Sequence, residues 1–144
     1  TASRFEVAGG ILRPLPTRDS FLPILATLSA SKNFGKTLSV MKSELGLPAT
    51  AADRLENYAT ERSSALMSVL RTDDGLRLFL RPLGEPMLID ETDGLRVTLA
   101  DGAIVHFRPS GNAPEMRCYV EASSADSAKR LLDHGLRLLS DFKA

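Results

Sequence analysis

The stretch LRVTLADGAIVHF, residues 95–107, holds the clearest structural signal in the chain. Its first half alternates polar residues with apolar ones, at Leu95, Val97 and Leu99. This alternation is typical of a strand with one buried face. Asp101-Gly102 follows, and a second apolar run covers residues 104–107. Asp-Gly between two such runs favours a tight hairpin because both residue types tolerate positive φ.

Downstream of the hairpin, the pattern predicts a loop, a third strand and a long helix. Residues 108–114 are rich in Pro, Gly and Asn, which is typical of a loop. An alternating strand follows, with apolar residues at Met116, Cys118 and Val120. Residues 124–142 carry a broad apolar stripe at helical spacing and predict an amphipathic helix.

Upstream of the hairpin, shorter segments extend the sheet. Residues 87–89 predict a strand before the Asp93-Gly94 turn, and the alternation of Leu76, Leu78 and Leu80 predicts another strand. Residues 60–70 have helical spacing, and residues 54–58 predict a short strand. The expected fold class is therefore α+β, with an antiparallel sheet flanked by two helices.

The N-terminal part of the chain has a different pattern. Residues 1–10 end in Gly9-Gly10 and resemble the last strand or loop of a domain that begins elsewhere. Thr17 is the predicted N-cap of a helix that continues to about Lys32, and a second helix is expected over residues 37–44, with Gly46 as its stop. We expect residues 1–48 to be the end of one domain and residues 49–144 to form another.

Composition narrows the function classes. The chain has 18 basic and 18 acidic residues and a pI near 6.7, so it lacks the basic excess of a nucleic-acid-binding protein. No apolar run approaches the roughly 18 residues that span a bilayer, and no signal peptide is recognised at the start. The single cysteine, Cys118, allows no internal disulfide, and we expect a cytoplasmic protein. Any anion that binds must be held by a local site.

The loop after residue 107 has the composition of such a site. Arg108 offers a planar fork of donors that matches phosphate oxygens. Ser110 and Asn112 add side-chain donors, and Gly111 leaves backbone N–H groups accessible to an anion. Arg117 adds a second positive charge downstream. The alternative is an ordinary Pro-Ser-Gly-Asn turn beside a solvated arginine.

Residues 105–122, VHFRPSGNAPEMRCYVEA, resemble the C-terminal signature of the α-D-phosphohexomutases. That signature reads R-P-S-G-T-E-P followed by a strand such as R-V-Y-V-E-A. The Asp-Gly pairs at 93–94 and 101–102, the segment TRD at 17–19 and the segment AADRL at 51–55 resemble further family segments in the same order. Asn112 and Ala113 depart from the family's Thr and Glu; Asn keeps a donor at its position, whereas Ala113 removes a carboxylate.

The resemblance implies a TBP-like C-terminal domain that clamps the phosphate of a hexose phosphate through Arg108, Ser110, Gly111 and Asn112. In this family, earlier domains carry a phosphoserine, a Mg²⁺ loop and a sugar-recognition loop. The enzymes interconvert hexose 1-phosphate and 6-phosphate through a hexose 1,6-bisphosphate. Residues 5–10, FEVAGG, resemble the sugar loop, in which Glu6 would accept hydrogen bonds from sugar hydroxyls; the alternative is a solvated glutamate.

No catalytic or metal-ligating residue is predicted in this chain. The sequence contains no Ser-His pair of the phosphoserine loop and no D-G-D-x-D metal loop. The acidic pairs 73–74 and 90–91 are interpreted as solvated turn residues, and His106 and His134 as structural or surface residues. We therefore expect a chain that depends on N-terminal domains outside this sequence for catalysis and is inactive alone. The alternative is a free-standing α+β ligand-binding or protein-interaction module.

Overall fold

The computed structural model describes residues 5–7, 10–12 and 20–143. The chain divides into two compact units, Thr1–Leu47 and Pro48–Ala144. Among the described residues, no helix combines the length and the apolar character needed to cross a bilayer.

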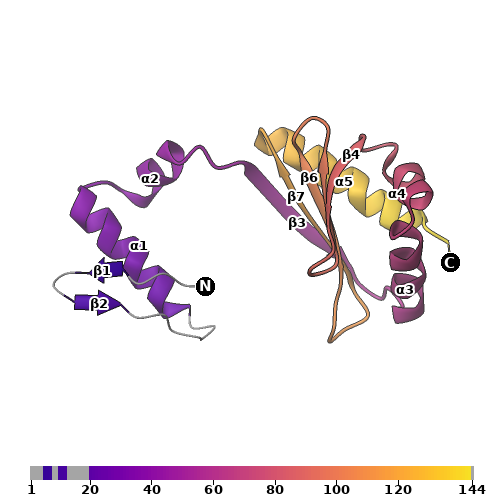
Figure 1. The fold of residues 1–144 in the computed structure, drawn as a ribbon, viewed down its shortest axis with the longest axis horizontal. Coiled ribbons are helices and arrows are strands. Elements are labelled where there is room, and N and C mark those ends of the chain that lie inside the picture. Colours follow the sequence, from indigo (N-terminus) through magenta and orange to yellow (C-terminus); the bar gives the residue numbers. More distant parts are fainter. Residues whose placement is uncertain (1–4, 8–9, 13–19, 144) are drawn as a thin grey trace. The chain divides into compact units, whose positions relative to one another are not determined.

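The described residues of the first unit form a pair of short antiparallel strands and two helices (Figure 1). Strand β1 (Phe5–Val7) pairs antiparallel with β2 (Gly10–Leu12), and helices α1 (Phe21–Phe34) and α2 (Leu38–Glu44) follow. The predicted N-cap Thr17 lies outside the described residues, and Ser20 precedes the first turn of α1. The second helix is confirmed: Thr37 caps it by accepting from the Val40 amide, and Gly46 follows its end.

The second unit is built on a five-stranded antiparallel sheet with the order β3-β7-β6-β5-β4. Its strands are β3 (Ala49–Leu55), β4 (Pro86–Asp90), β5 (Leu95–Leu99), β6 (Ile104–Pro109) and β7 (Met116–Ala122). The hairpin predicted from residues 95–107 is confirmed as β5 and β6, and the strand predicted from Met116 onward is β7. In β5 and β7, buried and partly exposed residues alternate along the strand, as expected for a sheet covered on one face.

Three helices cover that face: α3 (Thr60–Leu70), α4 (Asp73–Leu80) and α5 (Ala125–Asp141). Helix α5 packs along β3, β7 and β6, and its glycine at 135 permits the close approach, because a Cβ there would lie 2.9 Å from the Cys118 sulfur. The core between helices and sheet includes Phe107, Leu66, Leu80 and Leu139, each fully buried. The opposite face of the sheet carries the polar side chains and has no described helix over it.

The α+β class with an antiparallel sheet is confirmed, but one predicted strand was wrong. Residues 76–80 belong to α4, a third helix. Leu76 and Leu80 are one helical turn apart and both are buried, whereas Leu78 is 72% exposed. The Thr72 hydroxyl caps this helix by accepting from the Gly75 amide at 3.2 Å. Strand alternation fits all three leucines, whereas helical spacing fits only Leu76 and Leu80; the hydrogen-bonded cap at Thr72 favours the helix.

The strand expected at residues 54–58 was also misplaced. Strand β3 covers Ala49–Leu55, and each of its seven residues pairs with β7. Its Ala-rich start has low intrinsic strand preference, and pairing with a neighbouring strand overrides that preference. The helix predicted for residues 60–70 is confirmed as α3, and the helix at 124–142 as α5 with Ser124 as its N-cap.

Candidate functional site

The loop between β6 and β7, residues 110–115, is closed at its base and anchored to the helical layer. The Ser110 amide donates to the Glu115 carbonyl at 2.9 Å, and the Glu115 amide donates to the Ala113 carbonyl at 2.8 Å. The Tyr58 amide donates to the Pro114 carbonyl at 2.7 Å, which links the loop to the segment before α3. Backbone bonds therefore hold both ends of the loop.

Gly111 and Asn112 form the exposed tip of this loop. Gly111 is not among the described residues with positive φ, and a Cβ at its position would meet no described atom within 4 Å. The backbone of the tip therefore does not itself require glycine. None of the hydrogen bonds among the described residues engages the Ser110 hydroxyl or the Asn112 amide group, so both groups can turn to a ligand.

Three arginines lie side by side on the open face of the sheet. Arg54 on β3 is the register partner of Arg117 on β7, and Arg117 is the partner of Arg108 on β6. The three strands are adjacent (Figure 1), and neighbouring strands lie about 4.8 Å apart. Because the residues on either side of Arg117 in β7 enter the core, its side chain and those of its register partners project from the opposite face.

Carboxylates hold these arginines in place. Glu115 lies between two of them, with an oxygen 3.3 Å from Arg54 Nε and another 3.5 Å from Arg117 Nη2. Glu56 accepts from Arg54 Nη2 at 2.9 Å. The positive charge of the three arginines is thus partly neutralised, and the contact of Arg117 with Glu115 is the longest of these.

Arg108 is oriented by the turn that precedes β5. Its Nε donates to Asp93 Oδ1 at 2.8 Å. This hydrogen bond, and a further one with Tyr119, raise the pKa of Arg108 above its ordinary value, so the guanidinium stays charged. The ion pair with Asp93 is made through Nε, which leaves N–H donors of the terminal nitrogens for other acceptors.

His106 lies on the same open face, two residues before Arg108 in β6. Its Nε2 is 2.5 Å from the Asp93 carbonyl oxygen. A carbonyl oxygen only accepts, so Nε2 carries the proton. The imidazole also lies against the Tyr119 ring, with 5.4 Å between the ring centroids. These contacts give His106 a positioning role at the Asp93 turn.

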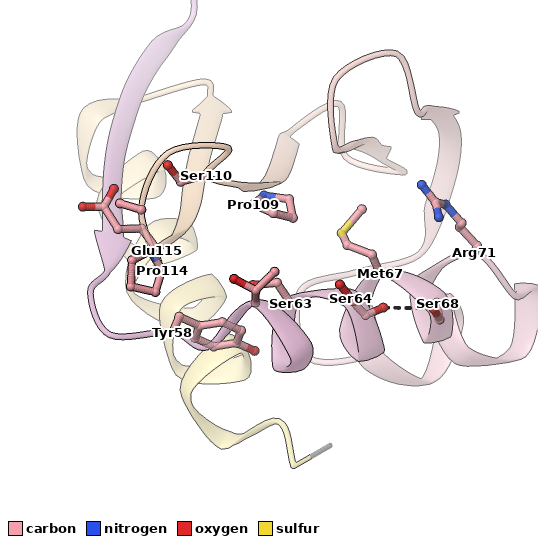
Figure 2. Close-up of a pocket in the computed structure, with 12 residues that line it drawn as sticks. Tyr58, Ser63, Ser64, Met67, Ser68, Arg71, Pro109, Ser110, Pro114 and Glu115 are labelled. Carbon is pink, nitrogen blue, oxygen red and sulfur yellow. Dashed lines mark hydrogen bonds between the residues drawn. The ribbon is translucent and has the colours of Figure 1, made fainter.

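A groove opens on the other side of the loop, between the loop and α3 (Figure 2). We refer to it as the α3 groove; its volume is about 270 Å³. One wall comes from α3 and the residues beside it, the other from the loop. The lining residues are Tyr58, Thr60, Ser63, Ser64, Met67, Ser68, Arg71, Pro109, Ser110, Ala113, Pro114 and Glu115.

No group of three or more His, Cys, Asp and Glu side chains is arranged to hold a metal ion in the part of the chain that the structure describes. Cys118 is buried under α5, and burial raises the pKa of its thiol to about 12. It is therefore a core side chain and not a nucleophile.

A sequence model of the family described as phosphoglucomutase/phosphomannomutase, C-terminal domain, matches residues 51–134. The match covers more than half of the chain and contains β5, β6, the loop and β7. The chain belongs to this family. The resemblance to the phosphohexomutases is thereby confirmed.

Similar curated proteins bear related names. A phosphomannomutase of Sinorhizobium fredii (strain NBRC 101917 / NGR234) is 44% identical over 140 residues, which are 96% of this chain and 29% of the relative. A phosphomannomutase of Salmonella muenchen is 36% identical over 138 residues, covering 93% of this chain and 27% of the relative. A phosphoglucosamine mutase of Methanococcus aeolicus is 42% identical over 53 residues. The chain thus spans less than a third of the length of the phosphomannomutases it matches.

Within this phosphohexomutase domain, the five predicted phosphate-binding residues occupy three settings. Arg108 and Arg117 are neighbours on the open face. Ser110 lines the α3 groove, and Gly111 and Asn112 form the loop tip between the two. The predicted sugar-binding residue Glu6 belongs to β1 in the first unit; only its backbone is described, and it pairs with Ile11.

Sequence reasoning missed the residues that hold the arginines. Glu115 and Asp93 are far from one another in sequence and gain their roles from strand pairing and from the turn before β5. Alternation along β3 could have placed Arg54 on the face of Arg117, but only with the strand correctly bounded.

Proposed function

We propose that this chain is the C-terminal, substrate-phosphate-binding part of a phosphohexomutase, an intramolecular phosphotransferase that interconverts hexose 1-phosphate and 6-phosphate. On this proposal residues 1–48 are the end of the sugar-binding third domain, with Glu6 in its sugar loop, and residues 49–144 form the phosphate-binding domain. The intact enzyme works in the cytoplasm with Mg²⁺ and a hexose 1,6-bisphosphate intermediate. The metal ligands and the phosphoserine lie in other domains.

The observation that carries the proposal is the position of the loop within the family match. The loop connects two paired strands, is closed by the Ser110–Glu115 hydrogen bond, and lies next to two adjacent guanidinium groups. A phosphate group at the tip would find neutral donors in Ser110 and Asn112, and charged donors in Arg108 and Arg117. On this proposal these groups donate hydrogen bonds to a phosphate dianion, and the phosphoryl carrier belongs to another domain.

The phosphate clamp can be tested by amide NMR titration of the 144-residue chain with inorganic phosphate. We expect saturable shifts at Ser110, Gly111 and Asn112 that are lost in Arg108→Ala. Arg96→Ala is the matched control, since Arg96 lies on the same sheet face on β5 but pairs with Glu121 at 3.2 Å. Equal weakening in both variants would reduce the effect to general electrostatics and contradict the clamp.

A second experiment tests whether the chain lacks catalytic activity without the other domains. Incubation of this chain with mannose 1-phosphate, Mg²⁺ and a hexose 1,6-bisphosphate should yield no mannose 6-phosphate, because the chain supplies binding groups without a phosphoryl carrier. Turnover by this chain alone would contradict the proposal.

A further inference from the structure

The two edge strands of the five-stranded sheet differ in what they expose to solvent. Strand β3 carries two exposed charged residues, Asp53 and Arg54, which discourage pairing with another strand. Strand β4, at the opposite edge, exposes three consecutive apolar residues: Met87 is 63% exposed, Leu88 69% and Ile89 49%. They are most of the exposed large hydrophobic side chains that the structure describes in the second unit. Such an edge favours pairing with a further strand.

The backbone of β4 is oriented to accept that strand. In an antiparallel sheet, successive residues direct their N–H and C=O groups to opposite neighbours. The Leu99 amide donates to the Ala103 carbonyl toward β6, so the preceding Thr98 directs its groups toward β4. Leu88 is the register partner of Thr98 and faces β5. The next residue, Ile89, therefore directs its N–H and C=O away from the sheet, on a side where the described residues form no strand.

The available part of this edge is short. Pro86 at the start of β4 has no N–H, and the register with β5 shifts between Pro86 and Leu88. Asp90 adds a charge at the end of the strand. Prolines, bulges and charges are the usual means by which proteins limit the addition of strands at an edge. Here they confine pairing to the apolar segment 87–89.

Ion pairs lie at both ends of this segment and make the edge complementary to itself. Glu85 pairs with Arg77 of α4, and Glu91 pairs with Arg71 at 3.1 Å. When two copies pair antiparallel about Leu88, Glu85 of one copy faces Glu91 of the other, because both lie three residues from Leu88. Each end then brings together two carboxylates and two guanidinium groups and has no net charge. Charge therefore does not oppose the pairing of two copies.

We propose that β4 is a dimerisation edge, on which a second copy of this chain pairs antiparallel, strand to strand. Leu88 lies at the two-fold axis against Leu88 of the second copy, and Met87 lies across from Ile89 of the second copy. The pairing uses the β4 edge of both copies, and the remaining β3 edges are charged, so assembly ends at the dimer. One edge contact buries less area than a standard interface, so the dimer dissociates in the micromolar to millimolar range.

Analytical ultracentrifugation of the 144-residue chain over a series of concentrations tests the proposal. The mass should rise from 15.6 kDa toward twice that value and no further. Hydrogen exchange followed by NMR reports on the edge itself, since strand pairing protects the outward Ile89 amide. Once nine-tenths of the chain is dimeric, this amide should exchange about tenfold more slowly than in dilute solution, because exchange then proceeds from the remaining tenth.

Two matched variants separate this edge from other apolar surface. Leu88→Lys removes an apolar contact and brings two like charges together at the axis, so it should raise the dissociation constant more than about tenfold. The Leu88 side chain is already exposed, so the urea midpoint should remain near that of the parent chain. Leu25→Lys changes a leucine of α1 that is 60% exposed and lies outside the sheet. This control should leave both the dissociation constant and the protection of the Ile89 amide unchanged.

Several outcomes would overturn the proposal. A mass that stays at 15.6 kDa at millimolar concentration would do so, and would leave an extended segment of a different protein as the occupant of the edge. Exchange of the Ile89 amide that does not depend on concentration would exclude strand pairing. Association that survives Leu88→Lys but is lost in Leu25→Lys would assign the contact to α1. Growth beyond the dimer would contradict the two-fold pairing. None of these measurements depends on the phosphate clamp.

Discussion

The two Asp-Gly turns of this domain differ in how closely other backbone atoms approach the glycine, and a pair of alanine substitutions can measure the difference in stability. Gly94 has φ of 86° and Gly102 has φ of 83°, so both adopt a backbone that side chains disfavour. A Cβ at Gly102 would meet nothing within 4 Å among the described atoms. A Cβ at Gly94 would lie 2.5 Å from the Phe107 carbonyl oxygen and 3.0 Å from the Arg108 Cα.

The magnitudes follow from these distances. The left-handed backbone costs an alanine about 1–2 kcal/mol, which is the whole effect expected for Gly102→Ala. In Gly94→Ala the colliding atoms are backbone, so no rotamer change relieves them, and overpacking adds about 1–3 kcal/mol. We therefore expect Gly94→Ala to lower the free energy of unfolding by about 2–5 kcal/mol.

Urea unfolding followed by circular dichroism measures the difference. The midpoint should fall much further for Gly94→Ala than for Gly102→Ala, with an unchanged slope. Because the displaced backbone includes Arg108, phosphate affinity should fall in Gly94→Ala alone. Equal destabilisation of the two variants would refute the close approach of the Asp93-Gly94 turn to β6.

Three further predictions concern single side chains. Asp93→Ala should weaken inorganic phosphate about two- to fivefold in a titration, because it frees the Arg108 side chain, whereas Asp93→Asn should retain most of the affinity and Asp101→Ala all of it. The Cys118 pKa of about 12 exceeds that of an unfolded cysteine, near 8.5, so the native state holds the thiol proton more tightly. Stability should therefore be intact below about pH 8.5 and fall as the pH rises toward 12, and Cys118→Ala should flatten this fall in urea titrations. The Tyr58 hydroxyl is buried with no hydrogen-bond partner among the described residues, so Tyr58→Phe should raise the free energy of unfolding by about 1–3 kcal/mol in the same assay; a decrease would reveal a partner.

The elements predicted best were those whose pattern is local and unambiguous. The hairpin of β5 and β6 carries a turn signal between two alternating runs, and α5 carries an apolar stripe over several turns. Helix α3 was predicted with its observed bounds. In each case neighbours in sequence are also neighbours in the element, so the sequence contains the relevant contacts.

The errors occurred where local pattern admits two answers. Leu76, Leu78 and Leu80 fit strand alternation, and Leu76 and Leu80 also fit helical spacing. Only the folded structure, in which Leu76 and Leu80 are buried and Leu78 is exposed, shows that the segment is a helix. Strand β3 begins with alanines, and its pairing with β7 determines its bounds.

The candidate site also has one part that the sequence predicts and one that it does not. The order of Arg108, Ser110, Gly111 and Asn112 along one loop is a property of the sequence, and it is sufficient to indicate anion binding and the family. The side of the sheet on which each of these side chains lies cannot be read from the loop sequence alone, because it depends on strand pairing.

Tertiary structure alone brings Arg54 beside Arg117, turns Glu115 toward both and opens the α3 groove behind the loop. These arrangements depend on the register between strands that are distant in sequence, and on the packing of α3 against the loop. A shift of one residue in register would move a side chain to the other face of the sheet, so only the folded chain decides them.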